Sequence, residues 1–101
     1  MNISTELKKY IDDKITKVLP NVIAFRHSRH SLPELTWEEF DTAAAVAKEL
    51  QAIDGVEVTE GIGRHGVVGF IKGNEKGPTI CLRADMDALP LQEKTSLPYC
   101  S

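Results

Sequence analysis

The segment GVEVTEGIGRHGVVGFI, residues 55–71, decides the fold, because the hydrophobic periodicity of the chain changes there from helical to extended. Residues 56–59 alternate with a period of two, and residues 67–71 form a nearly continuous apolar run. A second such run, residues 79–82, follows the glycine-rich polar sequence 72–78, which we expect to form a hairpin turn. Runs of this kind are typical of strands that are buried on both faces of a sheet.

Upstream of this segment, a first helix is predicted from near the start of the chain to about His30. Ser4 is a suitable N-cap, and Glu6 lies in the first turn, where a carboxylate interacts favourably with the helix dipole. Pro20 lacks the backbone donor of a helix interior, so it predicts a kink or a new helix start. The apolar residues that recur at helical spacing are Leu7, Ile11, Ile15, Val18 and Val22.

A second helix is predicted after a short connector. Pro33 disfavours helical backbone at the residue before it. Thr36 and Glu39 fit the Ser/Thr-x-x-Glu capping box that begins a helix, and this helix is expected to end near residues 54–55. The predicted class is therefore α/β: two helices, then a strand and hairpin portion of a sheet, and an irregular tail from about Asp85.

Composition excludes several classes of protein. Twelve Lys and Arg against 15 Asp and Glu give a net charge of −3, which excludes binding to nucleic acid through bulk positive charge. The 101 residues, 42% of them hydrophobic, suit one small globular domain. No apolar run approaches the roughly 20 residues of a membrane span. The first residues lack an apolar signal core, and Cys81 and Cys100 form no close pair, so we expect a reduced, cytoplasmic protein.

Two carboxylates, Asp85 and Asp87, flank Met86 directly after the predicted strand 79–82. Ligands of open α/β sheets gather at the carboxyl ends of strands, where two carboxylates could bind a divalent cation, act as acid and base, or orient a ligand. A solvated surface loop is the alternative, and the spacing alone does not choose between them. Arg83 could bind a carboxylate, although pairing with Asp85 or Asp87 is the simpler expectation.

The histidines offer weaker candidates. His27 and His30 are three residues apart on one helical face, so they could share a metal or simply bond carbonyl groups near the helix end. Without a third and fourth ligand they make a poor metal site. His65, in a turn, is expected at the surface.

Gly61, Gly63 and Gly66 imitate a phosphate-binding glycine loop. A dinucleotide-binding loop must precede a helix, whereas a strand follows here, so we interpret the glycines as turn residues with positive φ. Cys81 lies in the middle of an apolar run, and we expect it to be buried and protonated rather than a nucleophile.

Four motifs, in order over residues 22–101, resemble those of metal-dependent aminoacylases. This family includes hippurate hydrolases, N-acyl-amino-acid amidohydrolases and auxin-conjugate hydrolases. RHSRHSLPEL, residues 26–35, resembles an Arg-x-x-x-His-x-x-Pro-Glu-Leu signature, and residues 58–69 are similar to a Val-Thr-x-Gly-Ile-Gly segment. The most specific match is LRADMDALP, residues 82–90, and residues 97–101 continue it. Arg64-His65 departs from the family pattern, in which a small residue and Thr are usual.

The resemblance implies a zinc-peptidase-like α/β catalytic domain with a mixed sheet, and an inserted domain used for dimerisation. Residues 1–101 would be an incomplete N-terminal portion of the catalytic domain, without the dimerisation domain. The implied reaction is hydrolysis of the amide bond of a small, hippurate-like N-acyl amino acid by a homodimer, with Zn, Mn, Co or Ni as the metal.

Carried over residue by residue, the resemblance implies that Asp87 supports a metal-binding histidine and that Asp85 lines the active site. The family's Cys-Gly-His-Asp motif, later metal ligands and catalytic glutamate have no counterpart in this sequence, and Glu38-Glu39 match another position. We therefore expect no metal bound by this chain and no activity of the chain alone. The alternatives are one half of a split enzyme and a standalone α/β binding module.

Overall fold

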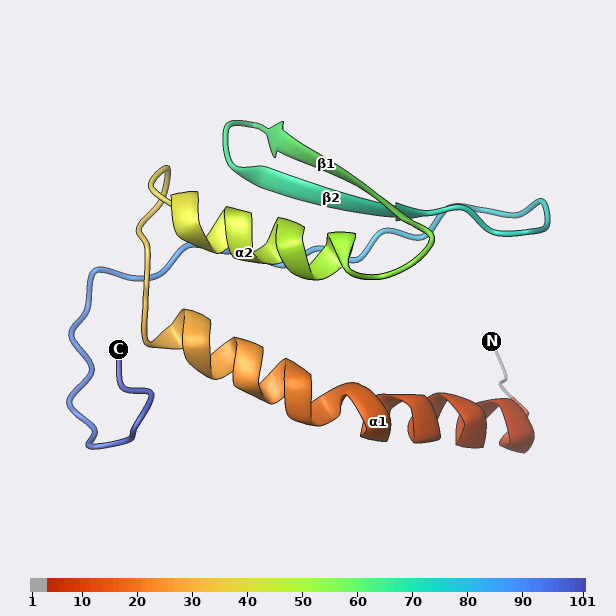
Figure 1. Ribbon diagram of the computed structural model, residues 1–101, viewed down its shortest axis with the longest axis horizontal. Helices are drawn as coiled ribbons and strands as arrows, with labels where there is room; N and C mark the ends of the chain where they lie inside the picture. Colours follow the sequence, from red (N-terminus) through yellow and green to blue (C-terminus); the bar gives the residue numbers. More distant parts are fainter. Residues whose placement is uncertain (1–3) are drawn as a thin grey trace. The chain divides into compact units, whose positions relative to one another are not determined.

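In the computed structural model of the chain, which describes residues 4–101, two helices precede a two-stranded sheet (Figure 1). The elements are α1 (Thr5–His30), α2 (Phe40–Gln51), β1 (Val56–Ile62) and β2 (Gly66–Ile71). They divide between two compact units. The first combines α1 with Glu93–Ser101, and the second, Pro33–Gln92, contains α2 and both strands.

Helix α1 begins and ends where the sequence predicts. Ser4 is its N-cap, with Oγ accepting a hydrogen bond from the Leu7 amide at 3.1 Å, and Glu6 lies in the first turn. The helix continues through Pro20 to His30, so of the two alternatives predicted at Pro20, a kink or a new helix start, the new start does not occur. Proline removes one hydrogen bond, and the remaining turns keep theirs.

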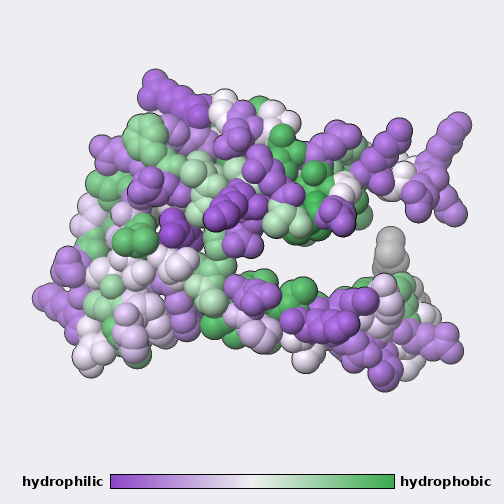
Figure 2. Space-filling view, viewed as in Figure 1, coloured by the Kyte–Doolittle hydropathy of each residue, from purple (hydrophilic) through white to green (hydrophobic). Residues whose placement is uncertain are grey.

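The apolar residues of α1 lie at its surface, and no residue of Thr5–His30 is buried (Figure 2). Five of the exposed side chains, at residues 7, 11, 15, 18 and 22, are the ones whose helical spacing predicted the helix. Within residues 4–101, no helix combines the length and apolar character needed to cross a membrane. The helical spacing of these residues therefore gives α1 an apolar face, but none of the residues on this face is buried.

Helix α2 begins later than the capping box predicts. Its N-cap is Glu39, whose side chain makes no capping hydrogen bond, and the helix ends at Gln51. The Thr36 hydroxyl bonds Asp87 instead, and the carboxylate of Glu34 accepts two amides at the start of α2. The predicted Thr36–Glu39 capping box is wrong, because the Thr36 hydroxyl bonds Asp87 and the Glu39 side chain makes no capping hydrogen bond.

Strands β1 and β2 form an antiparallel hairpin, in which Val56 pairs with Ile71 and Thr59 pairs with Val68. The loop between them is residues 63–65, and the positive φ of Gly63 (57°) confirms it as a turn glycine. Gly61 has the predicted positive φ (72°) but lies in β1, where the register shifts, and Gly66 lies in β2 without a positive φ, so the prediction is wrong for Gly66. The predicted hairpin at residues 72–78 is wrong, since in the described part of the chain no strand follows these residues to pair with β2.

The predicted third strand, residues 79–82, is also wrong, because these residues belong to neither a helix nor a strand. Ile80 and Leu82 are 80% and 95% exposed, and Cys81 is exposed rather than buried. An apolar run becomes a strand only where another strand pairs with its backbone, and within residues 4–101 none does. The α/β class is confirmed; the zinc-peptidase-like fold stays a prediction.

Helix α2 packs along the hairpin in the second unit (Figure 1). A Cβ at Gly69 would lie 3.2 Å from Cδ1 of Leu50 and 3.1 Å from Cγ1 of Val56, so the absent side chain permits this close approach. Among the described residues, Ala47 in α2 is the one buried hydrophobic residue, at 3% exposure. Thr42, also in α2, and Glu39, the N-cap of α2, are buried as well.

Candidate functional site

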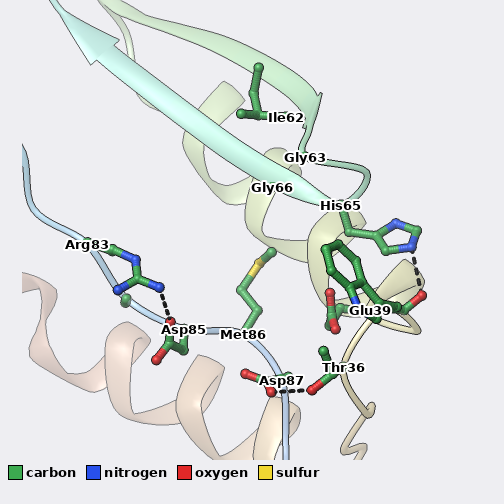
Figure 3. A pocket seen from close by; sticks show the side chains of 12 residues that line it. Thr36, Glu39, Ile62, Gly63, His65, Gly66, Arg83, Asp85, Met86 and Asp87 are labelled. Carbon is green, nitrogen blue, oxygen red and sulfur yellow. Dashed lines mark hydrogen bonds and ion pairs between the residues drawn. The ribbon is translucent and has the colours of Figure 1, made fainter.

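An open hollow of about 570 Å³ in the second unit contains both predicted site carboxylates (Figure 3). Three segments supply its wall: the connector before α2, the loop of the β1–β2 hairpin, and the extended stretch after residue 82. The lining residues are Thr36, Trp37, Glu39, Ile62, Gly63, His65, Gly66, Arg83, Ala84, Asp85, Met86 and Asp87. The hollow thus joins residues that lie up to 51 positions apart in the sequence.

Asp85 pairs with Arg83, as the sequence predicts. Nη2 of Arg83 lies 3.0 Å from Oδ1 of Asp85, and the two side chains are 85% and 70% exposed (Figure 3). An exposed ion pair of this kind contributes about 0–1 kcal/mol, so it orients the Asp85 carboxylate more than it stabilises the fold.

Asp87 has a different partner. Oγ1 of Thr36 donates a hydrogen bond to Oδ2 of Asp87 at 2.6 Å (Figure 3). A hydroxyl–carboxylate bond of this length is charge-assisted and stronger than a bond between neutral groups. Met86, between the two aspartates, points away from Asp87 toward the hairpin, as alternation along extended backbone requires (Figure 3).

The segment that carries Asp87 is also held through its backbone. The Ala88 amide donates to the carbonyl oxygen of Glu34 at 2.8 Å. The Glu34 carboxylate in turn accepts hydrogen bonds from the amides of Asp41, at 3.0 Å, and Thr42, at 2.5 Å. Sequence reasoning gave Glu34 only as part of a family motif. The capping role has no local signal, because the acceptor lies seven and eight residues before its donors.

His65 is half-buried and lines the open hollow. Its Nε2 donates to the Trp37 carbonyl oxygen at 3.0 Å, and its ring meets that of Phe40 edge-on at 4.4 Å. The neighbouring Arg64 guanidinium lies 4.8 Å from the Trp37 ring centroid. Both Trp37 (φ 69°) and Arg64 (φ 84°) adopt left-handed backbone, which is strained for residues other than glycine. The His65–Trp37 hydrogen bond and the Arg64–Trp37 contact stabilise this strained backbone beside the hollow.

His27 and His30, in the first unit, both contact the Tyr99 ring, and the His30 ring meets it edge-on with centroids 6.1 Å apart. The His27 ring stacks on that of Tyr99 with centroids 3.7 Å apart, while Nε2 of His30 lies 3.1 Å from Oε1 of Glu93. Within residues 4–101, no three His, Cys, Asp or Glu side chains are placed to hold one metal ion. Because a catalytic metal normally has three protein ligands, these residues do not by themselves fit the metal that the family resemblance implies.

Glu93 is the most strongly perturbed titratable group of the described residues, and sequence reasoning missed it. Hydrogen bonds from the Cys100 thiol, His30 and the Ser101 amide lower the pKa of Glu93 to about 2. Glu93 and burial raise the pKa of Cys100 above its ordinary value. His30 and Glu93 are 63 residues apart, so no local pattern announces their pairing.

The sequence of the chain is similar to those of several known proteins. No family model and no solved structure matches the chain. The hippurate hydrolase of Campylobacter jejuni is 54% identical over 76 residues, which are 75% of this chain and 20% of that protein. The thermostable carboxypeptidase 1 of Saccharolobus solfataricus is 40% identical over 97 residues, 95% of this chain and 24% of that protein.

The N-acyl-L-amino acid amidohydrolase of Geobacillus stearothermophilus is 34% identical over 96 residues, 95% of this chain. The chain spans a quarter or less of the length of these relatives. Over the residues that match, the chain belongs by sequence to the amidohydrolase family that includes hippurate hydrolase and N-acyl-L-amino acid amidohydrolase.

Proposed function

We propose that residues 1–101 supply part of the catalytic domain of a metal-dependent amidohydrolase that cleaves the amide bond of N-acyl amino acids, with hippurate-like compounds as substrates. The observation that carries this proposal is the 54% identity to hippurate hydrolase, combined with a hollow that is lined by both Asp85 and Asp87. The complete enzyme is proposed to be a homodimer.

Amide hydrolysis adds water to the carbonyl carbon, breaks the C–N bond and transfers a proton to the departing amine. A divalent metal such as Zn, Mn, Co or Ni, when bound by the complete enzyme, would polarise the carbonyl and lower the pKa of the attacking water. Asp85 and Asp87 alone fall short of the three ligands such a metal requires, so we propose that the isolated chain does not catalyse the reaction.

In this proposal the contribution of the chain is to position carboxylates. Asp87 accepts the Thr36 hydroxyl with Oδ2, and a carboxylate fixed in this way is suited to orient a histidine supplied by the rest of the enzyme. Asp85, held by Arg83 at the exposed rim of the hollow, is proposed to line the substrate side of the site.

A chimera tests the proposal. The segment of Campylobacter jejuni hippurate hydrolase that corresponds to this chain, 76 residues of which match, is replaced by residues 1–101. We expect the folded, metal-loaded chimera to hydrolyse hippurate. A chimera that folds and binds metal but does not hydrolyse hippurate would contradict the proposed role of the segment.

The isolated chain provides the second test. We expect no release of amino acid from hippurate or other N-acyl amino acids at millimolar Zn, Mn or Co. Turnover under these conditions, proportional to chain concentration and lost in a Cys-free, chelator-treated control, would contradict the proposed inactivity of the chain alone.

A further inference from the structure

We propose that Glu34 is a positioning residue that, together with Thr36, fixes residues 85–88, the Asp87 segment, to the start of α2. The importance of Asp87 itself rests on the proposed function, whereas the tie is a property of the folded second unit. We call residues 34–36 the clasp.

The first part of the clasp is the Glu34 carboxylate. The first amides of a helix have no partner within the helix, and the N-cap side chain usually accepts one of them. Here the N-cap is Glu39, whose side chain makes no such bond, and Glu34 accepts the amides of Asp41 and Thr42 instead. A negative group at this position also interacts favourably with the helix dipole. Glu34 is therefore anchored to α2 by two charge-assisted hydrogen bonds.

The second part is the backbone of the same residue. The Glu34 carbonyl oxygen accepts the Ala88 amide at 2.8 Å, immediately after Asp87 in the chain. Two residues beyond Glu34, Thr36 donates its hydroxyl to the Asp87 carboxylate at 2.6 Å. The clasp therefore binds both the backbone and the side chain of the Asp87 segment.

The Asp87 segment has little else to fix it. Residues 85–88 belong to no helix or strand, so no ladder of backbone hydrogen bonds sets their position. Asp87 is exposed, and Ala88 is half-buried. A shift of Glu34 relative to α2 would consequently move the Ala88 amide and the Asp87 carboxylate together. Loss of the cap is thus expected to change the exchange of the Ala88 amide.

Amide hydrogen exchange, followed by NMR on the full chain, tests the coupling. In Glu34→Gln, the carboxamide accepts only through its oxygen, so at least one of the Asp41 and Thr42 amides is released. We expect these amides and the Ala88 amide to exchange up to about tenfold faster, the effect of losing a typical hydrogen bond. The amides of the β1–β2 hairpin serve as the internal control and are expected to keep their rates.

Two outcomes would overturn the proposal. If Asp41 and Thr42 exchange faster while Ala88 does not, Glu34 is a helix cap only. If the Ala88 amide accelerates no more than the hairpin amides, the clasp has no local effect. Where Glu34→Gln fails to fold, the Thr36→Val and Thr36→Ser pair decides: Val is expected to speed Ala88 exchange, and Ser, which keeps the hydroxyl, is expected to restore it.

The chimera adds a readout that a structural role alone would not change. We expect Thr36→Val in the chimera to lower kcat about tenfold at unchanged KM, and Thr36→Ser to recover it. Equal loss in both variants would contradict positioning through the hydroxyl. Because exchange requires neither substrate nor metal, failure of the clasp and failure of the proposed function give separate results.

Discussion

The hydroxyl of Thr36 and the carboxylate of Asp87, 51 residues apart in sequence, share a hydrogen bond of 2.6 Å in the wall of an open hollow. This bond joins the connector before α2 to the stretch that carries both predicted site carboxylates. It also removes Thr36 from the capping role that its sequence context predicts. The site and the start of α2 are therefore built from the same few residues.

Thr36→Val tests this bond through stability. We expect the free energy of unfolding to fall by about 1 kcal/mol, because the variant keeps the side-chain volume but removes the donor to a charged acceptor that solvent partly screens. Thr36→Ser keeps the donor and is the matched control. Urea unfolding followed by circular dichroism gives both values, and equal stability of the Val and Ser variants would contradict the bond.

Glu34→Ala removes the acceptor for the first amides of α2. We expect a loss of about 1–2 kcal/mol, the range for deleting an N-cap side chain. Glu38→Ala, at an exposed glutamate in the same connector, is the control and is expected to stay within about 0.5 kcal/mol of the parent. The account would be wrong if both alanine variants unfolded at the same urea concentration.

Gly69→Ala places a methyl group against Leu50 and Val56, where the nearest carbons would lie 3.1–3.2 Å away. We expect destabilisation by about 1–3 kcal/mol, because overpacking forces α2 away from the hairpin. Gly73→Ala, at a position with open space, is the control. Thermal unfolding of the two variants should differ clearly, and matching melting temperatures would show that α2 does not press on Gly69.

The first unit should respond to acid. The pKa of Glu93 is lowered from 4.5 to about 2 by the Cys100 thiol, His30 and the Ser101 amide. Because the folded-state pKa is the lower one, the stabilisation is present above about pH 4.5 and is lost as the pH falls toward 2. We expect the Tyr99 ring signals, shifted by stacking on His27, to move toward unstacked values across this window.

Glu93→Gln is the control for this titration, since it removes the titrating group. Its Tyr99 signals are expected to show no transition between pH 4.5 and 2. A transition of the same size in the Gln variant would assign the acid response to another group.

The two helices could be predicted from sequence because their signals are local. The Ser4 cap, the Glu6 carboxylate and the helical spacing of apolar residues all lie within α1, and the structure confirms its bounds. The positive φ of Gly61 and Gly63 is local in the same sense, since it is a property of one residue.

The other features of the fold and of the candidate site depend on partners that are distant in sequence. Residues 79–82 have the composition of a strand, but a strand exists only with a neighbour, and none pairs with them within residues 4–101. Thr36 fits a capping box, yet Asp87 offers its hydroxyl a charged acceptor. The site carboxylates were found from their motif, whereas Glu34 as a cap and His65 as the partner of Trp37 required the folded arrangement.

The most direct test of the central claim is the kcat/KM for hippurate of the chimera that carries Asp87→Asn, beside that of the chimera that carries Asp54→Asn. Asp54 is an exposed aspartate in the turn after α2, so it controls for loss of a carboxylate alone. We predict that Asp87→Asn lowers kcat/KM by about 10–100-fold, the effect of removing a carboxylate that orients a metal-binding residue, and that Asp54→Asn changes it little. Equal activity of the two variants would contradict a role for Asp87 in the reaction.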